Sequence, residues 1–242
     1  MKTVGIVQAR MTSTRLPGKI LKTVLGKPLL EYELERLKRV DSLDELIVAT
    51  TTNIDDDPVV DLCRSMGVAT YRGSEHDVLS RYYEAASERN ADAVVRFTAD
   101  CPLIDPEIAE TVICHYLDHV DELDYCSTDV TTYPRGLDTE IFSMHALKVA
   151  FEQGHEKPDR EHVTYYIHTR PEKFRIWKQQ SGFDWAKYRL TVDTPEDFVL
   201  IKEIIERLYP MSDKFGLEDV IRLLESAPEL RNINADIRQK EI

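Results

Sequence analysis

The chain has 242 residues, of which 42% are hydrophobic and 31% are charged, and its formal net charge is −13. These values are typical of a folded globular protein with one large α/β domain, and nothing in them indicates disorder. So acidic a chain is unsuited to general nucleic-acid binding, which needs clustered lysine and arginine, but a local basic pocket can still hold a small anion.

The first hundred residues alternate between short apolar runs and amphipathic segments. The runs predict strands at 4–8, 45–51, 68–71 and 92–98, and the segments between them predict helices at 28–40, 57–66 and 77–89. Alternation at this spacing predicts a mainly parallel sheet with helices on both faces. Ligands of such sheets bind beyond the carboxyl ends of the strands.

The second half is less regular. We expect helices at 106–117, 144–153, 195–208 and 217–225, and short strands at 125–127, 140–142, 174–178 and 188–192. Without a repeat or a low-complexity linker, residues 1–242 are expected to form a single domain. The segment at about 128–185 is expected to serve as an arm, a lid or a dimer surface.

The cysteines and the hydropathy bear on the environment of the protein. The four cysteines show no CxxC spacing, which disfavours a zinc site and favours free thiols, buried in a reducing cytosol. The N-terminus runs directly into a strand without a signal-peptide pattern, and no apolar run approaches the roughly 18 residues of a membrane span. We therefore expect a cytoplasmic protein that does not enter a membrane.

The loop after the first strand is the most informative segment. Gln8–Lys19 places Arg10, Arg15 and Lys19 close together in an acidic chain, with hydroxyl side chains between them. Guanidinium groups bind phosphate oxygens in pairs, and a lysine adds a compact charge, so this composition suits a triphosphate. A solvated loop would have the same composition. The loop is neither a Walker A motif nor GxGxxG, which disfavours an ATPase and a dinucleotide dehydrogenase.

The same loop resembles a known signature, R-x-x-S-x-R-x-P-x-K, matched here by Arg10, Ser13, Arg15, Pro17 and Lys19. It belongs to the cytidylyltransferases that activate sialic acids and 3-deoxy-manno-octulosonate. Within that family the chain is most similar to the branch called spore coat polysaccharide biosynthesis protein F. The resemblance implies the nucleotide-diphospho-sugar transferase fold, which is GT-A-like. It also implies that the loop binds CTP through Gln8, Ala9, Arg10, Ser13, Arg15 and Lys19.

Two acidic positions follow predicted strands. Asp100 comes after the strand at 92–98, and Asp193 comes after the strand at 188–192. A carboxylate in such a place is often a turn or cap residue, which is the better account of Asp105 and Asp197. The resembled family uses the aspartates corresponding to Asp100 and Asp193 to bind Mg²⁺, and Mg²⁺ commonly takes one or two protein carboxylates.

The end of the second strand and the block after the third strand are candidates for contacts with the nucleoside. Thr50 and Thr51 are explained equally well by the preference of threonine for strands. The resemblance assigns both threonines to the nucleobase region. It also matches the R-G-x-x-x-D-V-L-x-R-Y block, in which we select Arg72 and Gly73 for the base and the ribose.

The acceptor side is expected in the second half of the chain. The blocks G-L-D-x-E and R-E-H-V-T of the resembled branch are present, and they select Arg135, Gly136, Glu140, Arg160 and His162. A polar loop and a helix cap would account for the same residues. The residues that mark a sialic acid or octulosonate carboxylate pocket in similar enzymes are missing. The arginines and the histidine therefore suit an acceptor with a carboxylate or a phosphate.

The sequence thus predicts a Mg²⁺-dependent enzyme that transfers CMP from CTP to a sugar or sugar acid and releases pyrophosphate. Arg10, Arg15, Lys19 and Asp100 are its expected catalytic residues, no residue stands out as a general base, and similar enzymes are often homodimers. The alternatives are another nucleotide donor, a sugar-phosphate or phosphonate acceptor, a non-catalytic sugar-nucleotide-binding protein and a glycosyltransferase. A glycosyltransferase would use a D-x-D motif, which Asp55–Asp57 contains by spacing.

Overall fold

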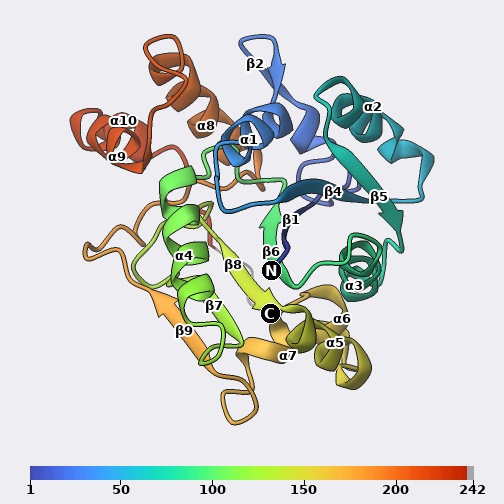
Figure 1. Ribbon diagram of the computed structural model, residues 1–242. Helices are drawn as coiled ribbons and strands as arrows, with labels where there is room; N and C mark the ends of the chain where they lie inside the picture. The colour runs from blue at the N-terminus through green and yellow to red at the C-terminus, as the bar shows by residue number, and fades with distance from the viewer. Residues whose placement is uncertain (239–242) are drawn as a thin grey trace.

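A seven-stranded sheet runs through the centre of the computed structural model, which describes residues 1–238 (Figure 1). Its strands, in spatial order, are β5 (Ala69–Gly73), β4 (Glu45–Thr51), β1 (Thr3–Gln8), β6 (Ala93–Thr98), β8 (Glu140–Ser143), β7 (Tyr125–Thr128) and β9 (Ile176–Gln179). The first four are parallel to one another, as are β7 and β9, whereas β8 is antiparallel to both of its neighbours. The prediction of a mainly parallel sheet is confirmed.

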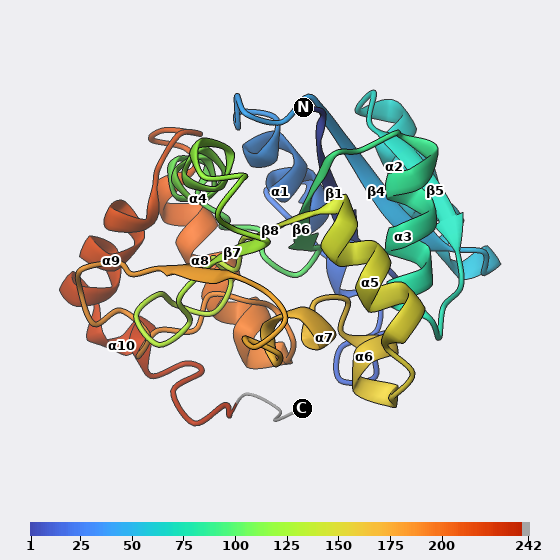
Figure 2. The same ribbon diagram turned by 60° about the horizontal axis from the view of Figure 1, so that its bottom comes forward.

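Helices cover both faces of this sheet, because the strands are apolar on both sides. In β1, Val7 faces a cluster with α1, α2 and α4, whereas Val4 and Ile6 face a cluster with α3 and α5. These helices span α1 (Leu29–Leu37), α2 (Asp57–Ser65), α4 (Pro106–Asp118), α3 (Val78–Glu88) and α5 (Met144–Gln153). Two short helices, α6 (Lys157–Glu161) and α7 (Tyr165–His168), follow α5, and Figure 2 shows them beyond its C-terminal end.

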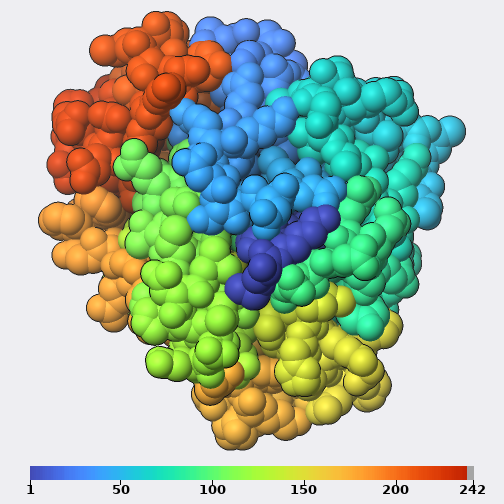
Figure 3. Space-filling model, in the orientation of Figure 1, coloured from blue at the N-terminus to red at the C-terminus, as the bar shows by residue number. Residues whose placement is uncertain are grey.

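A third hydrophobic cluster joins the C-terminal helices to the N-terminal part of the chain. It contains the apolar faces of α8 (Pro195–Leu208), α9 (Leu217–Ser226) and α10 (Pro228–Arg231). Leu29 and Tyr32 of α1 belong to the same cluster. In the space-filling view, these C-terminal segments, in red and orange, pack beside blue and green segments from earlier in the chain (Figure 3). This packing brings the end of the chain back toward the loop that follows β1.

Several helix boundaries agree with the sequence signals. The carboxylates of Asp77 and Asp105 accept hydrogen bonds from backbone N–H groups at the starts of α3 and α4. Thr194 caps α8 in a capping box with Asp197. Gly67 follows α2 with a φ of 66°, a backbone conformation in which glycine avoids the strain that a side chain would cause.

Other sequence predictions are wrong. Residues 188–192 are not a strand: the N–H of Leu190 donates to Arg135 and that of Val192 to Asp100, so loops satisfy this backbone. Arg81, in the R-G-x-x-x-D-V-L-x-R-Y block, is only 1% exposed, although an arginine on a helix usually faces solvent. The small hairpin of β2 (Thr23–Val24) and β3 (Lys27–Pro28) was not predicted, nor were α7, α10 and the 3₁₀ turns η1 (Lys19–Leu21) and η2 (Ile54–Asp56).

The segment 128–185, expected as an arm, a lid or a dimer surface, contributes to the body of the molecule. Strands β8 and β9 belong to the central sheet, and α5 packs against α3. Phe183, which stacks on Trp185, is exposed in the loop that follows β9. The tip of this loop is therefore the part of the segment that remains suited to a separate role.

All four cysteines are free thiols, but Cys114 is only partly buried, unlike the other three. Among residues 1–238, none of the helices combines the length and the apolar character that crossing a membrane requires.

Candidate nucleotide and metal site

The four parallel strands end at one edge of the sheet, and the loops that follow them form the candidate site. The loop after β1 is held at several points: Met11 N–H donates to Asp56 at 2.7 Å, and Thr12 Oγ1 donates to Glu75 at 2.6 Å. Gly18, at a φ of 67°, leads into η1, so that Lys19 is turned inward and is 8% exposed. Ser13 and Arg15 lie on the more open part of the loop.

Asp100 and Asp193 lie close together at this edge although 93 positions separate them in the chain. The carbonyl of Asp100 accepts hydrogen bonds from Val192 N–H at 2.8 Å and from Thr191 Oγ1 at 3.1 Å. Lys19 Nζ lies 2.7 Å from Asp100 Oδ2 and 2.7 Å from Asp193 Oδ1. The two predicted metal ligands and one predicted phosphate ligand are therefore in direct contact.

The charges in this contact stabilise one another. Burial tends to lower the pKa of Lys19, but the carboxylates of Asp100 and Asp193 outweigh it, and the pKa is raised. Burial tends to raise the pKa of Asp100, but the Lys19 ammonium outweighs it, and the pKa is held below its usual value. Lys19 and Asp100 are therefore both charged at neutral pH.

Two arginines also contact Asp193. Arg15 Nη2 lies 3.0 Å from Asp193 Oδ2, and Arg189 Nη2 lies 2.9 Å from the same oxygen. Arg189 also pairs with Asp197, which is completely buried. The Asp197 carboxylate accepts further hydrogen bonds from the backbone N–H groups of Asp193 and Thr194, so it fixes the position of the Asp193 segment.

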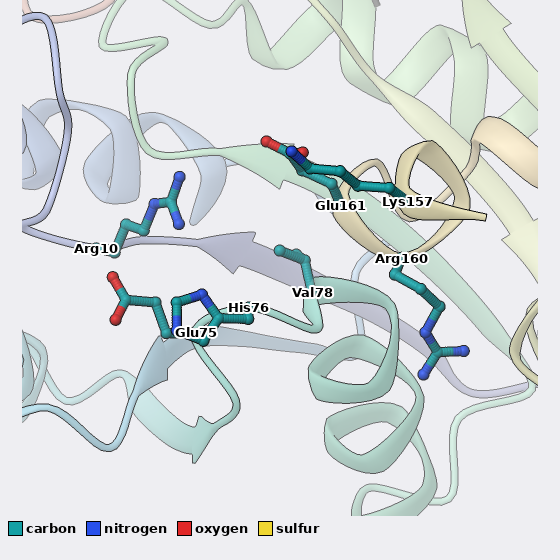
Figure 4. Close-up of a pocket in the computed structure, with 7 residues that line it drawn as sticks. All are labelled: Arg10, Glu75, His76, Val78, Lys157, Arg160 and Glu161. Carbon is teal, nitrogen blue, oxygen red and sulfur yellow. The ribbon is translucent and has the colours of Figure 1, made fainter. Parts of the chain in front are cut away.

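Arg10 is separated from these contacts and faces a cavity of about 390 Å³. No hydrogen bond or ion pair joins its guanidinium to the rest of residues 1–238, and the side chain is exposed. The lining residues are Arg10, Glu75, His76, Val78, Lys157, Arg160 and Glu161 (Figure 4). The cavity is therefore lined by cationic side chains from the β1 loop and α6 and by the carboxyl groups of Glu75 and Glu161.

The predicted nucleoside residues lie beside one another at the ends of β4 and β5. Arg72 Nε donates to the carbonyl of Thr51 at 2.8 Å, and its Nη1 pairs with Asp57 at 2.6 Å. Thr50 and Thr51 are buried, and Gly73 is packed under the side chain of Arg81. Arg72 thus fixes the loop after β4. The surface that this region presents to a ligand consists of the backbone of that loop and the side chain of Arg72.

The neighbouring acidic run does not provide the D-x-D site of a glycosyltransferase. Asp57 is paired with Arg72, and Asp56 is completely buried, where it accepts hydrogen bonds from Met11 N–H and Thr51 N–H. Asp56 thereby connects the loops after β1 and β4.

The predicted acceptor residues fall into three separate environments. Glu140 lies within the sheet, where its carboxylate contacts Arg96 and accepts hydrogen bonds from Tyr125 Oη at 2.5 Å and Thr164 Oγ1 at 2.6 Å. Arg135 pairs with Asp138 at 3.2 Å, next to Gly136. Arg160 lines the cavity, yet its guanidinium points away from Arg10 and pairs with Asp77 (Figure 4). His162 is partly buried just after α6.

The backbone conformation and the close neighbours of Gly136 require a glycine at this position, whether or not it contacts a ligand. Its φ is 106°, and a Cβ there would lie 2.5 Å from the backbone carbon of Leu190. We expect Gly136→Ala to lower the free energy of unfolding by about 2 kcal/mol or more, because it adds strain and a backbone clash. Gly182→Ala is the control, because its φ is 74° but no atom lies within 4 Å. Urea denaturation of both variants measures the difference, and equal losses would contradict the clash.

Some residues of the site could not be selected from the sequence. Glu33 of α1 is completely buried, and its Oε2 accepts a 3.3 Å hydrogen bond from Cys101 N–H, next to Asp100. Burial, with the charge of Asp100, raises its pKa well above the usual value. A glutamate among the leucines of a helix is a signal that could have indicated Glu33. Arg189, in contrast, could not be selected, because its segment alternates like a strand and nothing in it indicates a contact with Asp193.

One solved structure is very similar to this fold. A cytidylyltransferase from Leptospira borgpetersenii superimposes with a TM-score of 0.92 at 34% identity, over 100% of this chain and 99% of that one. A family model described as cytidylyltransferase matches residues 4–242. The chain therefore belongs to the cytidylyltransferase family.

Relatives of known sequence agree with this assignment. An uncharacterized protein of Methanocaldococcus jannaschii is 38% identical over 99% of this chain and 97% of its own. The spore coat polysaccharide biosynthesis protein SpsF of Bacillus subtilis is 31% identical over 93% and 94%. The mitochondrial 3-deoxy-manno-octulosonate cytidylyltransferase of Arabidopsis thaliana is 38% identical over 46% of this chain and 39% of that protein. The resemblance of the loop signature to this family is confirmed.

Proposed function

We propose that the protein transfers CMP from CTP to a sugar or sugar acid and releases pyrophosphate, with Mg²⁺ as cofactor. The observation that carries the proposal is the contact of Lys19 with Asp100 and Asp193, beside Arg15. Phosphate-binding cations and a carboxylate pair thereby meet at the edge of the sheet where α/β folds bind ligands. Family membership supports CTP as the donor.

The carboxylate pair fits a divalent metal ion. Asp100 and Asp193 both hold a cation already, the Lys19 ammonium, which stands at the place where a metal ion would satisfy the same oxygens. No group of three potential ligands among histidine, cysteine, aspartate and glutamate occurs within residues 1–238. Two carboxylates are enough for Mg²⁺, which completes its octahedron with phosphate oxygens and water. A bound Mg²⁺ ion would neutralise negative charge on the α-phosphate and on the leaving pyrophosphate.

The residues of the β1 loop hold the triphosphate. Arg15 and Lys19 lie beside the carboxylates and bind the phosphate oxygens near the reacting phosphorus, while Arg10 binds from the cavity side. Their charges stabilise the negative charge that develops on the phosphates in the transition state. Gln8, Ala9 and Ser13 complete the loop, and the edge formed by Thr50, Thr51, Arg72 and Gly73 holds the nucleoside.

The acceptor carries an anionic group and approaches from the second half of the chain. Although the carboxyl groups of Glu75 and Glu161 also line the cavity beside Arg10, the cationic groups of Arg10 and Lys157 there support this proposal. Arg160 of α6 lines the same cavity, His162 follows α6, and Arg135 and Gly136 lie on the loop before β8. Glu140 holds this region together through Arg96 and Thr164. A product used for surface or spore-coat polysaccharide agrees with the name of the relative in Bacillus subtilis. We also propose that the protein is cytoplasmic and forms a homodimer.

The direct test is pyrophosphate release in the presence of Mg²⁺, with CTP, UTP, GTP and ATP compared against a panel of 2-keto sugar acids and sugar phosphates. We expect release with CTP and one acceptor class. If another nucleotide is preferred, the donor is wrong. If CTP causes no shift in thermal stability and nothing reacts, the cytidylyltransferase proposal fails for this chain.

A further inference from the structure

The contact between Lys19 and the two carboxylates has a consequence for the order in which ligands bind. An ammonium group has three donors, and Lys19 directs two of them to Asp100 and Asp193, each at 2.7 Å. The Lys19 side chain is only 10% exposed, so solvent screens this contact weakly. The same two oxygens, Asp100 Oδ2 and Asp193 Oδ1, would hold the metal ion of the proposed function.

Lys19 and a divalent cation cannot hold these oxygens together, because like charges at this distance repel. If Lys19 left the carboxylates without a new partner, a buried ammonium would remain unpaired, which is strongly unfavourable. The Glu33 carboxylate is completely buried and already accepts a hydrogen bond from Cys101 N–H, so it does not take the place of the two aspartates. The anion that can receive Lys19 must therefore come from outside the chain.

We propose that Lys19 keeps the carboxylate pair closed to metal ions until the triphosphate of the nucleotide draws its ammonium away. This inference rests on the proposed function, since the triphosphate supplies the new partner. The movement needs only the side chain: Gly18 and η1 fix the backbone at Lys19, while the four-carbon stem is free to rotate. Arg15 is 40% exposed at its side chain and remains beside Asp193 during the exchange.

The exchange makes the binding of metal and nucleotide interdependent. Each ligand raises the affinity for the other by the same factor, as linkage requires. Without Lys19 the carboxylate pair would be open in the absence of nucleotide, so a variant with impaired catalysis would bind metal more tightly than the wild type. A purely supportive role for Lys19 predicts the opposite, because loss of a supporting contact weakens a metal site.

The test measures binding of Mn²⁺ alone, as the electron paramagnetic resonance signal of free Mn²⁺ in titrations without nucleotide. We expect Lys19→Gln to bind Mn²⁺ with an affinity about tenfold or more above that of the wild type, since the competing buried ion pairs are gone. Lys22→Gln is the matched control: it removes one positive charge from the same part of the chain without touching the carboxylates, and its affinity should equal that of the wild type. Adding Asp100→Asn to Lys19→Gln should abolish the gain, which places the ion at this pair.

The outcomes separate this inference from the proposed function. An unchanged or weaker Mn²⁺ affinity in a folded Lys19→Gln variant overturns the inference, even if the wild type releases pyrophosphate from CTP. If Lys19→Gln gains Mn²⁺ affinity but the wild type does not respond to CTP, the inference that Lys19 closes the carboxylate pair holds. In that case CTP is not the donor nucleotide. Circular dichroism establishes folding, and Lys19→Met serves in the same titration if the glutamine variant is unstable.

Discussion

Asp100→Asn is expected to lower kcat/KM for pyrophosphate release from CTP by a factor of about 100 or more, because charge stabilisation at the reacting phosphate is lost. The amide retains the size of the side chain but removes the negative charge that Lys19 contacts now and that a metal ion would need. Steady-state rates at several Mg²⁺ concentrations measure the effect. Excess Mg²⁺ should restore little activity, since the ligand itself has changed.

The control for this prediction is Asp118→Asn, which removes the same charge at the exposed end of α4. Its rate should remain within about twofold of the wild type, because exposed charges far from a site contribute little. Thermal unfolding of both variants shows whether the fold is retained. A folded Asp100→Asn variant with nearly normal kcat/KM would remove Asp100 from the catalytic site.

Local signals in the sequence were sufficient for most of the fold. The apolar runs in β1, β4 and β6 are strong signals because these strands are buried on both faces. The caps at Asp77, Asp105 and Thr194 depend on residues only two or three positions away. Parallel strands end at one edge, so the loop Gln8–Lys19 and Asp100 could be placed together without a structure.

Contacts between distant parts of the chain were beyond such signals. Lys19 meets Asp193 across 174 positions, and nothing in the periodicity near either residue specifies the other. Residues 188–192 alternate like a strand, but their N–H groups bond to the loops at Arg135 and Asp100. The alternation there reflects burial of Leu190 and Val192 in the C-terminal cluster, not membership of the sheet.

The acceptor region was the least predictable part of the site. Glu140 and Arg160 were selected as groups that contact the acceptor, yet each is already engaged by protein, Glu140 by Arg96 and Arg160 by Asp77. A charged residue in a sequence motif gives no indication of whether its partner is a ligand or another side chain. The same motif did lead to α6, where exposed Lys157 lines the cavity.

Asp197→Ala is expected to lower the free energy of unfolding by about 3–5 kcal/mol, because the buried guanidinium of Arg189 would lose a bidentate partner. Arg189 Nε lies 3.0 Å from Asp197 Oδ1, and Nη2 lies 3.1 Å from Oδ2. Asn234 Nδ2 also donates to this carboxylate, at 2.8 Å. For a chain of this length, the midpoint of thermal unfolding should fall by roughly 6–20 °C.

Glu196→Ala is the matched control, since Glu196 is exposed in the same first turn of α8 and should change stability by less than about 0.5 kcal/mol. A loss below about 1 kcal/mol for Asp197→Ala would show that the network around Arg189 contributes little. The variant also tests how the site is supported, because Asp197 accepts the N–H of Asp193 at 3.0 Å. If Asp193 depends on this bond for its position, Asp197→Ala at a temperature where it is folded should bind Mn²⁺ and CTP together more weakly than Glu196→Ala. Equal binding by the two variants would mean that Arg15 and Arg189 are sufficient to hold Asp193 in place.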